Sequence, residues 1–310
     1  MRMSTRVRAL LKDFRVHRTL WLMMIPAFVF FIVFSYIPMA GAYFAFTKYE
    51  FRLGYFRSPF IGLGNFAYLF KSGILSQLTI KTLLYNLAFI LFGNVAQILC
   101  ALFLNDLGSK RFVRVSQTII FLPYFISMVL VGVFAYNLLN IDNGFINSVL
   151  SHFGMKKFNF YMTPGAWPFI IVAFHVWKGL GYGTVIYLSA LTGLDPELYE
   201  AARIDGANKW QQIAYITIPL LKPTAVLLML FSLGSIMKGN FELFYQLVGK
   251  NGALYEATDI IDTYVYRALM VNYDIGMSSA AGLYQSVFGF LLVVTVNGLV
   301  KKYEASYALF

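Results

Sequence analysis

Long apolar runs separated by short polar segments form most of this chain. A helix of about 20 apolar residues crosses a hydrocarbon core of about 30 Å. Six runs reach that length, and they cover residues 20–46, 82–104, 115–139, 167–191, 219–240 and 277–299. The fifth run is the weakest, because its strongly apolar part extends only from Thr224 to Met237. The pattern predicts an all-α integral membrane protein with six transmembrane helices.

The composition supports a membrane protein. Hydrophobic residues make up 59% of the chain and charged residues only 13%, whereas a soluble domain carries about 25% charged residues. The uncharged run 20–46 is longer than the core of a secretory signal, about 7–15 residues, so we expect it to remain as a membrane span. The single cysteine, Cys100, can form no internal disulfide and is interpreted as a small buried hydrophobic residue.

The distribution of basic residues predicts the orientation. Six of the 25 Lys and Arg residues lie in residues 1–19, before the first span, and such a block holds the start of a chain in the cytoplasm. With this orientation the density of basic residues is about twice as high in the internal segments as in the external ones. We therefore expect a multi-pass protein of the cell membrane with both termini cytoplasmic. Residues 1–19 would form a basic N-terminal segment and residues 20–310 one transmembrane domain.

The internal loop 195–219 carries the most specific pattern in the chain. Asp195 followed by Pro196 is typical of a helix start. Gly206 can end that helix in a left-handed conformation, and a second short helix is expected from about Asn208. Pro219 would open the next span. These residues predict a helix–turn–helix at the cytoplasmic face, and from the residues alone a solvated amphipathic hairpin is an equally good interpretation.

A family signature resolves these alternatives. Glu200-Ala201-Ala202, then Gly206, then Ile216-Thr217-Ile218-Pro219 resembles the EAA signature of ABC importer permeases at every spacing. Ile218 stands where leucine is usual, which is a conservative change. The resemblance implies that this loop couples the chain to an ATPase. The residues implied in coupling are Glu200, Ala201, Ala202, Asp205, Gly206, Ala207, Ile216 and Pro219.

Further phrases extend the resemblance over nearly the whole chain. Residues 36–39 with 45–46, 62–66, 176–184 and 259–267 look like the LplB branch of carbohydrate permeases. This branch implies that the cargo is a carbohydrate, most simply an oligosaccharide.

The resemblance also implies the partners. Such a permease pairs with a second, related permease chain and with two ATPase subunits, and an extracellular solute-binding protein delivers the cargo. The ATPase subunits would bind ATP and magnesium, and this chain would hold no cofactor. The sequence agrees, because it contains no G-x-x-x-x-G-K-[ST] loop to bind phosphates.

Polar residues inside or beside the spans are candidates for the solute path. Lys178 lies near the middle of the fourth run, and a charged residue at that depth pairs within the protein or lines a water-filled path. Asn240, Glu242 and Tyr245 could hydrogen-bond to and stack on a sugar, although aromatic residues also gather at membrane interfaces. The remaining polar residues, which we expect to hydrogen-bond to neighbouring helices, are Asn86, Asn94 and Gln97.

Two other classes of protein remain as alternatives. An ion-coupled secondary transporter often has buried carboxylates, but no Asp or Glu lies within a predicted span. A membrane-embedded enzyme needs titratable groups gathered at one depth, and only Lys178 with His175 suggests such a group. His17, His152 and His175 show no metal-ligand spacing. We therefore expect no enzyme activity, metal site or nucleic-acid partner.

Overall fold

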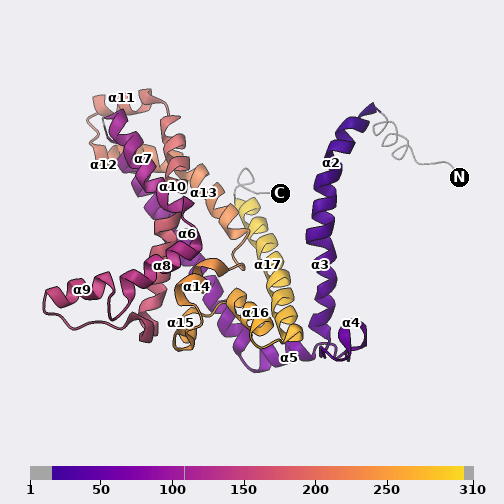
Figure 1. Ribbon diagram of the computed structural model, residues 1–310. Coiled ribbons are helices and arrows are strands. Elements are labelled where there is room, and N and C mark those ends of the chain that lie inside the picture. Colours follow the sequence, from indigo (N-terminus) through magenta and orange to yellow (C-terminus); the bar gives the residue numbers. More distant parts are fainter. Residues whose placement is uncertain (1–15, 108, 304–310) are drawn as a thin grey trace.

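The computed structural model describes residues 16–107 and 109–303, and within these residues the protein is helical without a named strand (Figure 1). A single antiparallel bridge joins Thr47 to Phe60. Five helical runs of the described part are long and apolar enough to cross a membrane, and one bent pair makes a sixth. The predicted all-α membrane fold is therefore confirmed, and the six-span count agrees with the structure once the bent pair is counted as one span.

The first half of the chain contains four of the membrane elements. The first span is a single helical run built from α2 (Arg18–Phe31), η1 (Ile32–Tyr36), α3 (Ile37–Met39) and η2 (Ala40–Phe46). Two short helices follow, α4 (Gly54–Arg57) and α5 (Gly64–Lys71). Then come α6 (Ile74–Asn105), α7 (Lys110–Phe125), α8 (Met128–Leu139) and the short helix α9 (Phe145–His152).

The second half begins with the short turns η3 (Phe160–Met162) and η4 (Pro164–Ala166), which lead into the long helix α10 (Trp167–Thr192). The predicted hairpin and the next span are α11 (Pro196–Ile204), α12 (Lys209–Gln212), η5 (Ile213–Thr217) and α13 (Ile218–Leu233). The short elements α14 (Phe241–Val248), η6 (Gly252–Leu254), α15 (Tyr255–Thr258) and α16 (Ile261–Met270) follow, and α17 (Ile275–Tyr303) is the last span.

The predicted second span begins too late in the sequence. Helix α6 starts at Ile74, eight residues before the predicted start at 82. Lys81 and the polar residues near it lower the local hydropathy, but Leu75 and Leu78 keep the apolar period and are buried. Gly73, at φ +71°, marks the start of the helix.

The predicted third span is not one helix. Helices α7 and α8 meet at an angle of 99°. The break lies at Ile126 and Ser127, both of which have extended backbone conformations, and the Ser127 hydroxyl accepts the Leu130 N–H at 3.4 Å to cap α8. Hydropathy cannot detect this break, because residues on both sides of it are apolar.

The predicted fifth span has its end in the wrong place. The helix stops at Leu233, and residues 234–240 form turns that lead into α14. At the other end α12, η5 and α13 join without a break, so a single helical run extends from Lys209 to Leu233. The fourth and sixth spans agree with their predicted limits to within a few residues.

Contacts between loops place the connecting segments at two opposite ends of the helices. At one end Lys209 of the hairpin forms an ion pair with Asp106, which follows α6. At the other end the Asn251 amide donates to the Tyr161 carbonyl at 2.8 Å, and the Asn65 amide donates to the Thr47 carbonyl at 3.0 Å. Figure 1 shows the same grouping, with α11 and α12 at one end and α5, α15 and α16 toward the other. This grouping agrees with the predicted internal and external segments.

The first span stands apart from the other helices (Figure 1). No side chain of α2 is buried, and the run makes its main contact at its outer end, where Ala45 of η2 is fully buried with Ala280 and Ala281 of α17. Most of the predicted basic segment 1–19 lies outside the described residues, as do residues 304–310.

The predicted topology can be tested by labelling single cysteines in a Cys100→Ala background. Ser151, Lys250 and Ser109 are all exposed. In intact cells an impermeant thiol reagent should label cysteines at positions 151 and 250 and should not label one at position 109 until the membrane is permeabilised. Labelling of position 109 alone in intact cells would contradict the orientation.

Candidate functional site

The hairpin in residues 195–219 begins as the sequence predicts. The Asp195 carboxylate accepts the Glu197 N–H at 2.9 Å, and Pro196 occupies the first helical position of α11. Proline there loses no helical hydrogen bond, and the carboxylate satisfies an N–H that the helix cannot.

The turn between the two hairpin helices depends on Gly206. Its φ is +82°, a left-handed conformation in which a side chain is strained. The Gly206 N–H donates to the Arg203 carbonyl at 3.1 Å, and the Ala207 N–H donates to the Ala202 carbonyl at 2.8 Å. This pair of bonds is a Schellman motif, which ends α11 and reverses the chain.

The second hairpin helix is fixed by its cap and by contacts with the first. Asn208 and Gln211 form a capping box, in which each side chain accepts the other residue's N–H. The Tyr199 hydroxyl lies 3.0 Å from the Thr217 hydroxyl and so joins α11 to η5. The hairpin is therefore a defined structure with its own hydrogen bonds.

The outward surface of the hairpin carries large apolar side chains. Ile204, Trp210 and Tyr215 are 86%, 80% and 79% exposed. Exposed apolar side chains of this size are candidates for contact with another protein. Sequence reasoning did not select these three residues, although large apolar side chains in an otherwise polar hairpin were a visible signal.

The signature residues occupy both faces of the hairpin. Ala202, Ala207 and Ile216 are half-buried and lie toward the hairpin's interior contacts. The remaining signature residues are exposed, and these are Glu200, Ala201, Asp205, Gly206 and Pro219.

A groove of about 760 Å³ lies between α6, α10 and α13. Its walls alternate apolar side chains with groups that can hydrogen-bond, and no Asp or Glu lines it. The polar or aromatic lining residues are Asn86, Phe89, Asn94, Gln97, His175, Tyr182, Phe231, Ser232 and Ser235. Such a surface suits a solute rich in hydroxyl groups, because it offers hydrogen bonds together with aromatic faces.

Polar residues of the second span contribute to this groove while also binding neighbouring helices. The Gln97 amide donates to the Gly179 carbonyl at 3.2 Å, and the Tyr187 hydroxyl donates to Asn94 Oδ1 at 2.7 Å. The predicted hydrogen bonds between helices are thus present for Asn94 and Gln97. Asn86 differs, because its amide donates within α6 to the Thr82 carbonyl.

Lys178 lies at the break between α7 and α8. Its ammonium donates to the carbonyls of Pro123, Tyr124 and Ile126 at 3.2, 3.1 and 2.5 Å. These carbonyls belong to the last turn of α7 and the residue after it, where a helix leaves its acceptors unsatisfied and carries partial negative charge. This geometry favours a structural role for Lys178.

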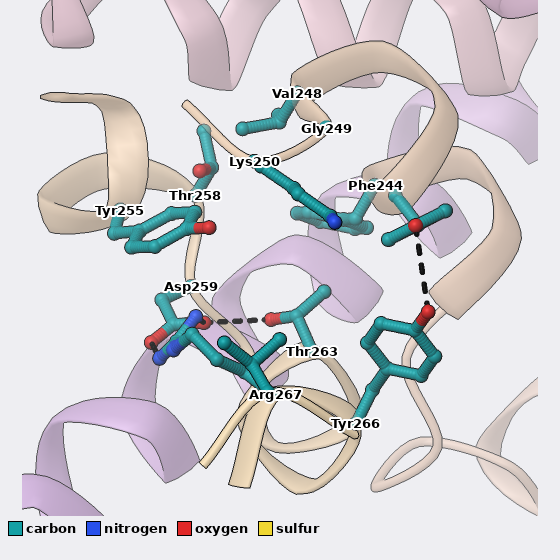
Figure 2. A pocket seen from close by; sticks show the side chains of 12 residues that line it. Phe244, Val248, Gly249, Lys250, Tyr255, Thr258, Asp259, Thr263, Tyr266 and Arg267 are labelled. Atoms are coloured by element: carbon teal, nitrogen blue, oxygen red, sulfur yellow. Dashed lines mark hydrogen bonds and ion pairs between the residues drawn. The ribbon is translucent and has the colours of Figure 1, made fainter. Parts of the chain in front are cut away.

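The other predicted path residues lie in α14 or at its start. The Asn240 side chain caps α14 by accepting the Leu243 N–H at 3.2 Å, and Glu242 is exposed. Tyr245 accepts a hydrogen bond from the Tyr266 hydroxyl at 3.4 Å and helps to line a small cavity of about 30 Å³ (Figure 2). None of these three residues lines the membrane groove.

An ion pair organises the small outer cavity. Figure 2 shows Arg267 against Asp259, with Nη2 to Oδ2 at 2.5 Å and Nη1 to Oδ1 at 3.0 Å. The Arg267 guanidinium also lies 4.4 Å from the ring centre of Tyr255, and Thr263 donates to Asp259 at 2.7 Å. Because the charges of the pair are matched within the protein, the cluster holds α15 and α16 together.

The non-helical segment 234–240 is attached to its neighbours by two side chains. Asp262 Oδ2 accepts the Gly239 N–H at 2.7 Å and the Gln285 amide at 2.9 Å, and the same amide donates to the Met237 carbonyl at 2.6 Å. A Cβ on Gly239 would lie 2.2 Å from the end of the Ile260 side chain and 2.9 Å from Asp262 Oδ2, so these side chains would have to move. Burial raises the pKa of Asp262, while the two donors act in the opposite direction.

The residues that the structure describes contain no cluster of three His, Cys, Asp or Glu side chains that could hold a metal ion.

A family model describes the same chain. Residues 90–304 match the family "Binding-protein-dependent transport system inner membrane component". The match covers more than half of the chain and includes the groove helices α10 and α13 and the hairpin.

Curated relatives are similar over nearly their whole length. The polygalacturonan/rhamnogalacturonan transport system permease protein YteP of Bacillus subtilis is 36% identical over 285 residues, which are 92% of this chain and 88% of the relative. Protein LplB of the same organism is 32% identical over 92% of this chain and 89% of its own length. These matches confirm the predicted resemblance to the LplB branch.

Solved structures show the same fold. A bacterial ABC transporter involved in the import of the acidic polysaccharide alginate contains a chain with a TM-score of 0.86 and 32% identity, covering 96% of this chain and 99% of that one. The alginate transporter in complex with a periplasmic protein bound to alginate pentasaccharide gives a TM-score of 0.84 at 32% identity, covering 94% and 97%.

The role of Lys178 can be separated from cargo contact by two substitutions. Lys178→Met removes the donor to three carbonyls, and losing charge-assisted hydrogen bonds of this kind costs about 1.5–3 kcal/mol. We expect a lower thermal midpoint for the purified protein in detergent, with partial recovery in Lys178→Arg. A Met variant with an unchanged midpoint but impaired transport would instead place the ammonium in contact with cargo.

Proposed function

This chain belongs to the binding-protein-dependent transport system inner membrane component family, and we propose from that premise that it imports oligosaccharides as the pore-forming permease subunit of an ATP-driven complex. The groove between α6, α10 and α13 is the observation that carries the proposal. One wall of this groove, α13, continues without a break into the cytoplasmic hairpin. The solute path and the coupling surface therefore share one helix.

The hairpin would bind an ATPase subunit. Its exposed Ile204, Trp210 and Tyr215 give an apolar surface at the cytoplasmic end, and the Gly206 turn gives that surface a fixed shape. Two ATPase subunits, one under each permease chain, would bind ATP and magnesium. Closure of the two ATPases would move the hairpins and switch the membrane helices between inward- and outward-facing states.

A second, related permease chain would complete the path. The groove is open on one side in this chain, and α2 has no buried side chain among its described residues. Lipid can cover an apolar helix, but a helix so detached from its own chain is also suited to pack against a partner. Both termini would lie in the cytoplasm in this assembly.

The relatives support an acidic oligosaccharide as the cargo. One is named for the transport of polygalacturonan and rhamnogalacturonan, and one solved transporter imports the acidic polysaccharide alginate and was captured with a loaded periplasmic protein. We infer that an extracellular solute-binding protein delivers a uronate-containing oligosaccharide to this chain and its partner.

Ion-coupled secondary transport is the alternative from the sequence. The spanning helices that the structure describes contain no Asp or Glu, so they provide no carboxylate for proton coupling within the membrane.

The proposal predicts that oligosaccharide uptake requires both permease chains, the ATPase, ATP and the binding protein. In proteoliposomes containing this chain, its partner permease and the ATPase, oligogalacturonide should accumulate only when ATP is inside and the binding protein is outside. Replacing ATP with a non-hydrolysable analogue should abolish uptake. Accumulation driven by a proton gradient without ATP would contradict the proposal and support secondary transport.

Gly206→Val should disconnect ATP hydrolysis from transport. A β-branched residue at φ +82° is strained, by roughly 1–2 kcal/mol, so α12 should change direction and the hairpin should lose its fit. Ala202→Asp should have a similar effect by placing a charge in the half-buried interior of the hairpin. The measurements are the number of ATPase subunits that copurify and the cargo-stimulated rate of ATP hydrolysis.

Gly154→Val is the matched control. Gly154 has φ +69°, and a Cβ added there would meet no atom within 4 Å, as is also true of Gly206. Gly154 lies in the external loop after α9, far from the hairpin in the sequence. We expect this variant to keep ATPase occupancy and stimulation. If both hairpin variants also keep them in full, the hairpin is not the coupling element.

A further inference from the structure

A second cavity of about 350 Å³ lies between the segment 234–240 and α17. Ser235 lines both this cavity and the larger groove between α6, α10 and α13. A solute in the larger groove could therefore extend into the second cavity without leaving the protein surface.

Lys238 is the charged residue of this second cavity. Its side chain is exposed, and no carboxylate in the described residues forms an ion pair with it. Asp262 is near, but its Oδ2 already accepts the Gly239 N–H and the Gln285 amide. An ammonium that lines a cavity without forming an ion pair is available to a charged solute.

The backbone around Lys238 is held in place. The Lys238 N–H donates to the Ser235 carbonyl at 2.8 Å. The residue before it is bound to Gln285 through the Met237 carbonyl, and the residue after it is bound to Asp262. Because the attachment of the side chain is fixed, less conformational freedom is lost when the ammonium binds a partner.

The other groups of the cavity complement a sugar ring. The Ser235 and Ser286 hydroxyls donate to the Ser232 and Gly282 carbonyls at 3.1 and 3.0 Å, so their oxygens remain able to accept hydrogen bonds from sugar hydroxyls. Phe290 is 68% exposed and lines the same cavity, which provides an apolar face.

We propose that Lys238 is a specificity-determining residue that pairs with the carboxylate of a uronic acid unit while neighbouring units occupy the larger groove. The inference rests on the proposed import of uronate-containing oligosaccharides and names the residue that recognises their charge. The lining of the larger groove contains no Lys or Arg, so the charge of the cargo is recognised at Lys238 and its hydroxyl groups are recognised in the groove.

The test compares Lys238→Gln with Lys238→Arg in proteoliposomes of the complete importer. At a limiting concentration of trigalacturonate, uptake by Lys238→Gln should fall about tenfold, the effect of losing one charge-assisted hydrogen bond. Lys238→Arg keeps the charge and should stay close to wild type. The fully methyl-esterified trimer, which is neutral, should be taken up equally by wild type and by Lys238→Gln.

Two controls make each outcome decisive. Lys71→Gln removes an exposed lysine at the end of α5 and should change neither uptake. If the wild type does not take up the ester, two other measurements test whether Lys238→Gln is correctly assembled. These are its basal rate of ATP hydrolysis and the amount of partner permease that copurifies with it.

Undiminished uptake of trigalacturonate by Lys238→Gln would overturn the inference. So would equal loss for both trimers, or loss of the partner permease, since either would show that Lys238 pairs with protein and not with cargo. Absence of ATP-dependent uptake of any oligosaccharide by the wild type would instead refute the proposed function.

Discussion

Every backbone N–H and C=O within a membrane needs a partner from the protein, and this requirement determines where the helices of this chain can be broken. Two breaks stand out in the described residues. At the first, the Lys178 ammonium bonds to three carbonyls at the end of α7. At the second, Asp262 and Gln285 bond to the backbone of the segment 234–240. Each break is stabilised by side chains from other helices, so the bend of α7 and the early end of α13 depend on the tertiary structure.

The breaks have a functional consequence because α13 ends where the groove ends. A regular helix to residue 240 would place side chains at helical positions along the segment 234–240. The turns instead direct Ser235 and Lys238 into a cavity beside α17. Helices also pack closely elsewhere in the fold. A Cβ on Gly181 would lie 2.4 Å from the Phe121 backbone, so α7 and α10 approach each other at a glycine.

Features that depend on local sequence could be predicted, and features that depend on distant partners could not. The hairpin was predicted closely, because Asp195, Gly206 and Asn208 act on backbone groups within a few residues of themselves. The break in the third span was missed, because its stabilising group comes from Lys178, more than 50 residues away. Lys178 was recognised as unusual from its charge alone. Its partners could not be predicted, because every residue has a backbone carbonyl and the sequence does not indicate which ones a lysine binds. The apolar surface at Trp210 was visible in the sequence and was not interpreted.

The helical run from Lys209 to Leu233 is unbroken, so a force on one of its ends would be transmitted to the other. At 1.5 Å per residue its 25 residues extend about 37 Å, with the hairpin at one end and the wall of the groove at the other. Lys209, the first residue of the run, forms an ion pair with Asp106, and Leu221, midway along the run, packs into the core formed with α6 and α10. A pivot at Leu221 divides the run into two arms of similar length, so a tilt that moves the hairpin end in one direction would move Ser232 by a comparable distance in the opposite direction.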